Sequence, residues 1–188
     1  ISHLLNSSIY LFVFGVLLLS FPLLYFAESA LGHHLQYYLS VFLSATISTA
    51  MVFFVAVYST TRNLKKAFLY YSLLFPLFLA VNLGLSLHNS FAVLKGYLGQ
   101  QSPFVRTPKF NLTSSQDKWS DKRYLMRQGM GILLLECLLM LYFLGAIAFA
   151  VQTENYLMLP LHILAVAGFA ILIFFTLKHS FWFGTAAR

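Results

Sequence analysis

The sequence is poor in charged residues and in cysteine. Only 9% of its 188 residues are Asp, Glu, Lys or Arg, whereas 60% are hydrophobic. This leaves too little polar surface to solvate a globule of 21.3 kDa, so the composition excludes a soluble globular protein. The single cysteine, Cys137, lies inside an apolar run, which excludes a disulfide framework and a cysteine metal site.

The first residues also lack the marks of a signal peptide. Residues 1–8 have neither a charged start nor a small-residue cleavage site. Because the chain begins with Ile rather than Met, we interpret it as a piece of a longer protein.

The charges that are present are mostly basic and unevenly placed. All twelve Lys and Arg residues fall in short polar segments between apolar runs of about twenty residues, and the net charge is +7. An α-helix rises ~1.5 Å per residue and the hydrocarbon core is ~30 Å thick, so such runs are long enough to cross a bilayer. The sequence therefore predicts an all-α integral membrane protein. Basic residues beside spans fix orientation and contact anionic lipid headgroups, so we expect membrane lipids and no nucleic acid as partners.

Five apolar runs stand out, and none has the period-2 alternation of a barrel strand, so each is predicted to be helical. They are Ser7–Ala27, Leu39–Val57, Phe68–Leu87, Gly131–Val151 and Tyr156–Leu177.

The distribution of Lys and Arg bears on how many runs cross. The connection Ser59–Lys66 and the segment His88–Gln128 are basic, whereas Glu28–Gln36 has no Lys or Arg. If all five runs crossed, the two basic segments would lie on opposite sides, against the positive-inside rule. If the third run does not cross, every Lys and Arg falls on one face. We therefore predict four transmembrane helices plus a re-entrant or interfacial hairpin, with the basic loops and the C-terminus cytosolic.

The third run supports this prediction. Pro76 lies at its centre and removes a helical hydrogen bond, and the second half is semi-polar. A true span kinked by Pro76 is the alternative. Apolar residues around Lys95 then predict an amphipathic interfacial helix that ends at Gly99. The predicted organisation is 1–66, first transmembrane helix pair; 67–99, re-entrant and interfacial helices; 100–128, a cytosolic gating-type loop; and 129–188, second transmembrane helix pair and cytosolic tail.

The loop carries the candidate binding residues. Within four residues the loop has the planar guanidinium group of Arg106, the hydroxyl of Thr107 and the point charge of Lys109. Together these groups suit a phosphate or diphosphate. Phe104 argues against a purely solvated linker. On spacing alone, a loop that contacts headgroups is the other interpretation.

The stretch SPFVRTPKF follows NSFAVLKGYLG and precedes a further pair of spans. In this order of segments the chain resembles the C-terminal membrane region of processive-type family 2 glycosyltransferases. This is the group of bacterial cellulose synthase and cellulose-synthase-like enzymes. Their gating loop, Phe-x-Val-Thr-x-Lys, also lies between an interfacial helix and a pair of spans. Phe104, Thr107 and Lys109 match this pattern, and Arg106 replaces its Val.

The resemblance implies that Thr107 and Lys109 approach a nucleotide diphosphate while Phe104 packs over it. We infer that Arg106 adds a charge to the leaving diphosphate. The resemblance also implies a nucleotide-sugar donor, a glycan or lipid acceptor and a bacterial inner membrane.

The family's catalytic motifs are absent: there is no Asp-x-Asp, and residues 116–119 read QDKW where Gln-x-x-Arg-Trp would be needed. This chain alone is therefore predicted not to catalyse transfer. No cofactor is expected in it, and a divalent Mg²⁺ or Mn²⁺ is expected in a catalytic domain outside it. The alternative is a non-catalytic membrane scaffold subunit of a larger complex, in contact with other membrane subunits.

Glu136 is the intramembrane polar residue of greatest interest. An ionised carboxylate in a span is costly, so Glu136 should be protonated or paired. It either lines an acceptor or lipid path or anchors a neighbouring helix through Ser48, Thr49 or Thr176. His162 is predicted to lie at another depth and not to pair with Glu136. The row Ser40, Ser44 and Ser48 is predicted to let another helix approach closely.

Overall fold

The architecture was taken from a computed structural model, which describes residues 7–26, 30–100 and 130–184, with side chains for all of these except 30–45 and 179–184. The described residues form five helices: α2 (Ile9–Tyr25), α3 (Ala30–Thr61), α4 (Leu64–Tyr97), α5 (Met130–Gln152) and α6 (Leu159–Gly184). Over these residues the all-α prediction is confirmed, and each of the five apolar runs is helical.

Three helical segments are long and apolar enough to cross a membrane, namely Leu64–Tyr97, Met130–Gln152 and Leu159–Lys178. Two shorter apolar helical segments are Ile9–Tyr25 and Thr46–Thr61. These lengths and compositions support an integral membrane protein.

Two predicted boundaries are wrong. The connection Glu28–Gln36 is shorter than expected because α3 already begins at Ala30. The third run has no hairpin turn, and no separate interfacial helix follows it, because residues 64–97 form one helix with Pro76 inside it. Proline removes only one hydrogen bond of this helix. The polar side chains bond to its own backbone instead of breaking it, as when the Asn82 amide donates to the Phe78 carbonyl at 2.7 Å.

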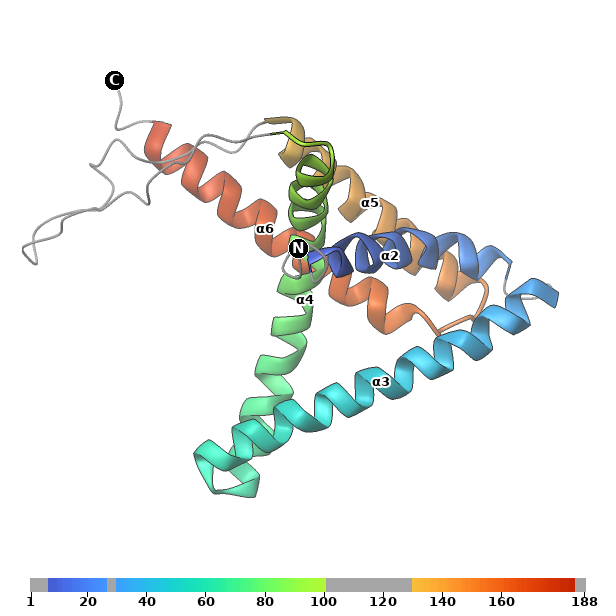
Figure 1. Ribbon diagram of the computed structural model, residues 1–188, viewed down its shortest axis with the longest axis vertical. Coiled ribbons are helices and arrows are strands. Elements are labelled where there is room, and N and C mark those ends of the chain that lie inside the picture. The colour runs from blue at the N-terminus through green and yellow to red at the C-terminus, as the bar shows by residue number, and fades with distance from the viewer. Residues whose placement is uncertain (1–6, 27–29, 101–129, 185–188) are drawn as a thin grey trace, which may run out of the picture.

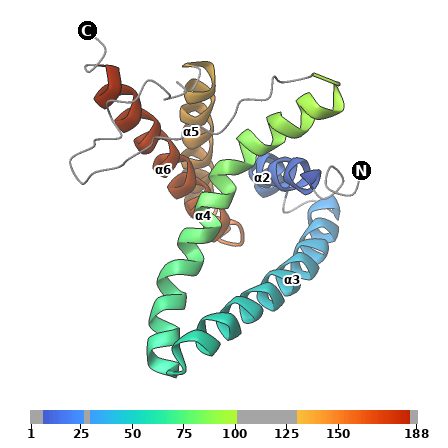
Figure 2. The same ribbon diagram turned by 60° about the vertical axis from the view of Figure 1, so that its left-hand side comes forward.

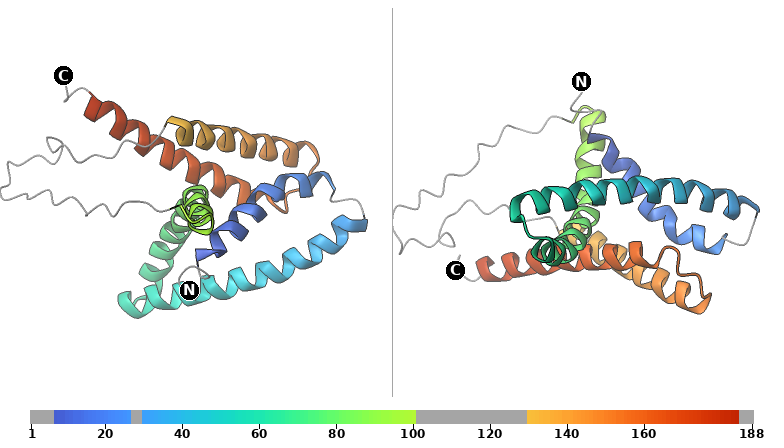
Figure 3. Two further views of the ribbon diagram at one scale, coloured as in Figure 1. Left: turned by 45° about the horizontal axis from the view of Figure 1, so that its top comes forward. Right: turned by 90° about the horizontal axis from the view of Figure 1, so that it is seen from below.

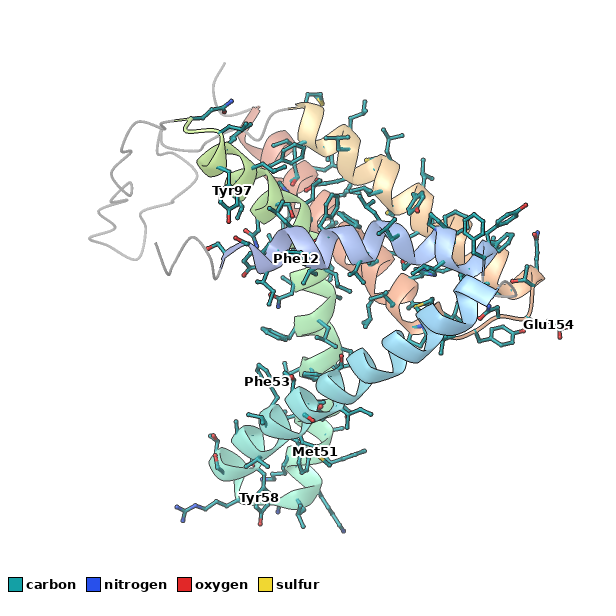
Figure 4. The ribbon with its side chains drawn as sticks, turned by 45° about the vertical axis from the view of Figure 1, so that its right-hand side comes forward. Phe12, Met51, Phe53, Tyr58, Tyr97 and Glu154 are labelled. Atoms are coloured by element: carbon teal, nitrogen blue, oxygen red, sulfur yellow. The ribbon has the colours of Figure 1, made fainter. Side chains whose placement is uncertain are left out.

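The helices α5 and α6 lie side by side as an antiparallel pair, and α4 lies across this pair and across α2 (Figures 1 and 3). Figures 1 and 3 show α2 ending, α3 beginning and α5 joining α6 at one end, which the α5–α6 turn with Glu154 marks in Figure 4. The helix α3 ends at the turn into α4, on the far side of the molecule from the start of α5 and the end of α6 (Figures 1 and 2). The helix α4 runs along the longest dimension of the molecule, with its first residue at the turn from α3 and its last residue on the side where α5 begins (Figures 1 and 2).

The helices α3 and α4 form an open hairpin whose tip stands away from the other helices (Figure 2). At the tip, Arg62 takes a positive φ of 48° and reverses the chain. The Asn63 side chain then caps α4 by accepting from the Lys66 backbone N–H at 3.2 Å.

The core lies where α2, α4, α5 and α6 meet. Its main buried cluster comprises Leu17, Leu87, Phe143, Ala165 and Phe169. The Phe143 and Phe169 rings are stacked with centroids 6.1 Å apart. A second cluster, of Leu24, Ala150 and Met158, lies nearer the α5–α6 turn. The side chains described for α3 lie outside both clusters.

Candidate functional site

The predicted nucleotide-binding loop lies outside the described residues. Phe104, Arg106, Thr107 and Lys109 all fall within 101–129, so their prediction stays untested. Of the predicted site residues, Glu136 is described, and the candidate site is built around it.

Glu136 is fully buried in α5, with a relative exposure of 0%. Its Oε1 atom lies 2.6 Å from Nε2 of His88 on α4. The His88 side chain keeps 28% of its surface exposed. The distance is that of a charge-assisted hydrogen bond, which satisfies a carboxyl oxygen that has been removed from water. The two residues therefore tie α4 to α5.

A second buried pair ties α2 to α6. Ser20 and His162 are both buried, and Ser20 Oγ lies 2.9 Å from His162 Nε2. The Ser20 hydroxyl donates to the Leu17 carbonyl at 2.6 Å, so its oxygen accepts from the Nε2–H of His162. His162 bonds to Ser20 and Glu136 bonds to His88, so the two do not pair with each other, as predicted.

Further hydrogen bonds run from side chains to the backbone of α2. Ser90 on α4 donates to the Tyr10 carbonyl at 3.0 Å. Tyr142 on α5 donates to the Leu18 carbonyl at 2.6 Å. Together with the His88–Glu136 and Ser20–His162 pairs, these bonds connect α2 to each of α4, α5 and α6, and α4 to α5.

The helices α4 and α6 approach each other closely at two glycines. A Cβ atom added to Gly168 would lie 2.0 Å from the Ala80 carbonyl oxygen. A Cβ added to Gly84 would lie 2.8 Å from the Gly168 carbonyl carbon. Ala80 and Gly84 are four residues apart on α4, the small-xxx-small spacing that lets membrane helices pack closely. By contrast Ser48, the described member of the predicted small-residue row on α3, is exposed.

The described residues contain no group of three or more His, Cys, Asp or Glu side chains that could hold a metal ion. The divalent metal expected from the resemblance therefore finds no ligand set in this part of the chain.

The carboxyl–imidazole pair can hold a proton between two helices and can keep their relative position. It lies nine residues before the end of α4 at Tyr97 and six residues after the start of α5 at Met130. It is therefore close to the two helix ends that border residues 101–129.

The sequence identifies Glu136 but does not pair it with His88, which lies just after the semi-polar second half of the third run. The available signal was that Glu136 is the one acidic residue inside an apolar run and that His88 lies at the end of another. Pairing them required the crossing of α4 over α5, which no sequence spacing gives. The bond has the form of an anchor between helices, one of the two predicted roles of Glu136, but it joins Glu136 to His88, which was not among the predicted partners Ser48, Thr49 and Thr176.

No protein-family model, curated protein or solved structure matches this chain.

Proposed function

We propose that this chain is the membrane region of a processive-type family 2 glycosyltransferase, which transfers a sugar from a nucleotide sugar to a glycan or lipid acceptor. The observation that carries the proposal is the position of α4. The helix α4, which lies across α2, α5 and α6, leads into residues 101–129, and the antiparallel pair α5 and α6 follows (Figure 1). This order is the one that the resemblance of SPFVRTPKF implies.

The proposed topology has four crossings, by α2, α3, α5 and α6, with α4 lying along the cytosolic leaflet. Length and composition alone would let α4 cross. Its direction favours the other arrangement, because a helix that lies across α2, α5 and α6 is nearer to the membrane plane than these helices are (Figures 1 and 3). The cations at its ends, Lys65 and Lys66 at one and Lys95 at the other, then share one side, as the positive-inside rule favours. The membrane would be a bacterial inner membrane.

Cysteine labelling tests the topology. In a Cys137→Ala background, Thr60→Cys and Gln100→Cys place single thiols at the two ends of α4, and Asn155→Cys places one in the α5–α6 turn. A membrane-impermeant maleimide should label the first two from the same side and Asn155→Cys from the other. Labelling of Thr60→Cys and Gln100→Cys from opposite sides would show that α4 crosses, and the proposed order of elements would fail.

In the proposed mechanism, residues 101–129 act at the nucleotide. Thr107 and Lys109 would hold the nucleotide diphosphate by a hydroxyl hydrogen bond and a point charge, and Phe104 would cover it. Arg106 would add a bidentate contact to the leaving diphosphate. A catalytic domain outside this chain would bind Mg²⁺ or Mn²⁺ and carry the reacting carboxylates.

Substitution in the loop tests the mechanism. In the full-length protein, Thr107→Ala with Lys109→Ala should reduce transfer from a nucleotide sugar by at least tenfold, and membrane insertion should be unchanged. Lys118→Ala is a matched control, because it removes a cation of the same segment outside the FVRTPK stretch. Equal activity of the double variant and the control would remove this stretch from the mechanism.

The second candidate function is a non-catalytic scaffold subunit, favoured by the surface of α3. Its described side chains are largely exposed, with Met51 at 66%, Val52 at 68% and Val55 at 61%. Such a surface suits contact with another membrane subunit as well as with lipid. Gentle detergent extraction of the native assembly, followed by mass measurement, separates the two functions. A catalytic domain on the same polypeptide supports the transferase, and a separate copurifying polypeptide supports the scaffold.

A further inference from the structure

The tip of the α3–α4 hairpin carries three exposed cations close together. Arg62 forms the turn, and Lys65 and Lys66 lie in the first turn of α4. The backbone beneath them is fixed, because Arg62 N–H donates to the Tyr58 carbonyl at 2.8 Å and Asn63 caps Lys66. The three charges are therefore held together by the fold and not by chance orientations of a loose segment.

These cations have no acidic counterpart within their own hairpin. The sequence contains no Asp or Glu from residue 29 to residue 116. Among the described residues the acidic ones are Glu136, which is buried and bonded to His88, and Glu154, which lies in the α5–α6 turn, away from the tip (Figure 4). Within the part of the chain that the structure describes, no salt bridge is formed by Arg62, Lys65 or Lys66. The described part of the chain therefore does not neutralise the charges of these three residues.

Large apolar and aromatic side chains surround the same cations. Leu64 is 63% exposed, Phe68 66% and Leu69 67%. Tyr58 and Tyr70 are also exposed, and phenol rings prefer the level of the headgroups. A soluble phosphate or a nucleic acid would leave these apolar side chains in water. An amphiphile with a phosphate headgroup and acyl chains would cover both kinds of surface at once.

We propose that the tip of the α3–α4 hairpin, defined by Arg62, Lys65 and Lys66 with the neighbouring Tyr58 and Tyr70, is a binding site for the headgroup of an anionic phospholipid. The Arg62 guanidinium suits two oxygens of one phosphate, and the lysines add point charges. The acyl chains lie against Leu64, Phe68 and Leu69. The site does not depend on glycosyl transfer, and it anchors the part of the molecule that stands farthest from the core.

Native mass spectrometry of the detergent-solubilised chain tests the proposal, with phosphatidylglycerol and phosphatidylcholine as probes. The unsubstituted chain should bind phosphatidylglycerol more tightly. In the Arg62→Gln, Lys65→Gln, Lys66→Gln variant this preference should fall by up to about 100-fold, since each cation at an anionic surface contributes about fivefold. The charge-conserving variant Arg62→Lys, Lys65→Arg, Lys66→Arg should keep most of the preference.

The control is Lys95→Gln with Lys178→Gln, which removes two cations outside the hairpin tip. It should retain the preference for phosphatidylglycerol nearly unchanged. An equal loss in the control would mean that net charge alone attracts the lipid, and the site would be refuted. Full retention in the triple variant would refute it too. Displacement of the lipid by soluble glycerol phosphate would show that the site binds free phosphate, and the lipid assignment would be overturned.

Discussion

The two halves of α4 have opposite surroundings although they belong to one continuous helix. In residues 64–79 only Ala67 is buried. In residues 80–97 the buried positions are Ala80, Gly84, Ser86, Leu87, Ser90 and Val93. The first half contacts α3, and the second half contacts α6 and α2 (Figure 2).

The difference lies in the kind of contact. Between helices in lipid there is little hydrophobic driving force, so close packing and hydrogen bonds must hold them together. The second half of α4 uses both, through the Gly84–Gly168 approach and through His88 and Ser90. The first half uses aromatic rings, such as Tyr71 stacked on Phe75 of the same helix and Phe54 against Tyr71 across the hairpin. We therefore expect substitutions in the second half to cost more stability.

The largest effect is expected from Gly168→Ala. The added methyl group would lie 2.0 Å from the Ala80 carbonyl oxygen, so the backbones of α4 and α6 must separate. Overpacking of this kind costs on the order of 3 kcal/mol, which lowers Tm by roughly 10 °C. Thermal unfolding in detergent measures the change.

The control for this substitution is Gly15→Ala on α2, where an added Cβ would meet nothing within 4 Å. Its Tm should stay the same or rise slightly, because Ala favours a helix over Gly. Equal Tm values for the two variants would show that α4 and α6 do not approach at these glycines.

Next in size is the loss of the link between α4 and α5. Glu136→Ala removes the partner of His88, and hydrogen bonds to charged groups contribute about 1.5–3 kcal/mol. Glu136→Gln should cost less, since the amide oxygen can still accept from Nε2. Thermal unfolding of Glu136→Ala, His88→Ala and the double variant gives the coupling energy. Strictly additive losses would contradict the pair, and Glu154→Gln, in the exposed α5–α6 turn, should have no effect.

The sequence was sufficient for the helices but not for their crossings. Apolar runs and the spacing of Lys and Arg identified all five helical segments, because a span must satisfy its backbone internally whatever surrounds it. The prediction of a helix broken at Pro76 is wrong, because α4 continues through it. Hydrogen bonds from Asn82 and Ser86 to their own helix show that polar side chains there need no break.

The sequence predicted only part of the candidate site, because the rest depends on how the helices cross. Glu136 was visible because a carboxyl group in an apolar run is rare. Its partner His88 and the glycine contact of Gly84 with Gly168 depend on how α4 crosses its neighbours. The first of these contacts joins residues that are 48 positions apart in the chain, and the second joins residues that are 84 positions apart. No local sequence pattern reaches over such separations.

A smaller loss of stability is expected from Ser20→Ala, which removes the hydroxyl that bonds to both His162 and the Leu17 carbonyl. A buried hydrogen bond of this kind contributes on the order of 1 kcal/mol. The control is Ser72→Ala in the first half of α4, where the hydroxyl is exposed and bonds to its own helix at the Phe68 carbonyl. A lower Tm for Ser20→Ala than for Ser72→Ala would support the comparison, and the reverse order would contradict it.

The smallest effect on Tm is expected from Phe53→Ala in the α3–α4 hairpin. The Phe53 ring lies 5.8 Å from that of Phe75 and 5.1 Å from that of Phe78, between centroids, but the residue is already 39% exposed. An aromatic pair contributes about 0.5–1.5 kcal/mol beyond burial, and lipid or detergent can replace part of the lost contact. The core of α2, α5, α6 and the second half of α4 does not include Phe53. The global transition should therefore stay nearly in place while the hairpin loosens.

Spin labels on exposed positions of the two hairpin helices measure this loosening directly. With Val52→Cys on α3 and Leu73→Cys on α4 in a Cys137→Ala background, Phe53→Ala should broaden the distribution of distances between the labels. The control Phe12→Ala removes a ring that is 73% exposed on α2 and should leave the distribution unchanged. A large drop in Tm for Phe53→Ala would mean that the hairpin and the core unfold as one unit. The contrast between the two halves of α4 would then describe only their contacts and not their stability.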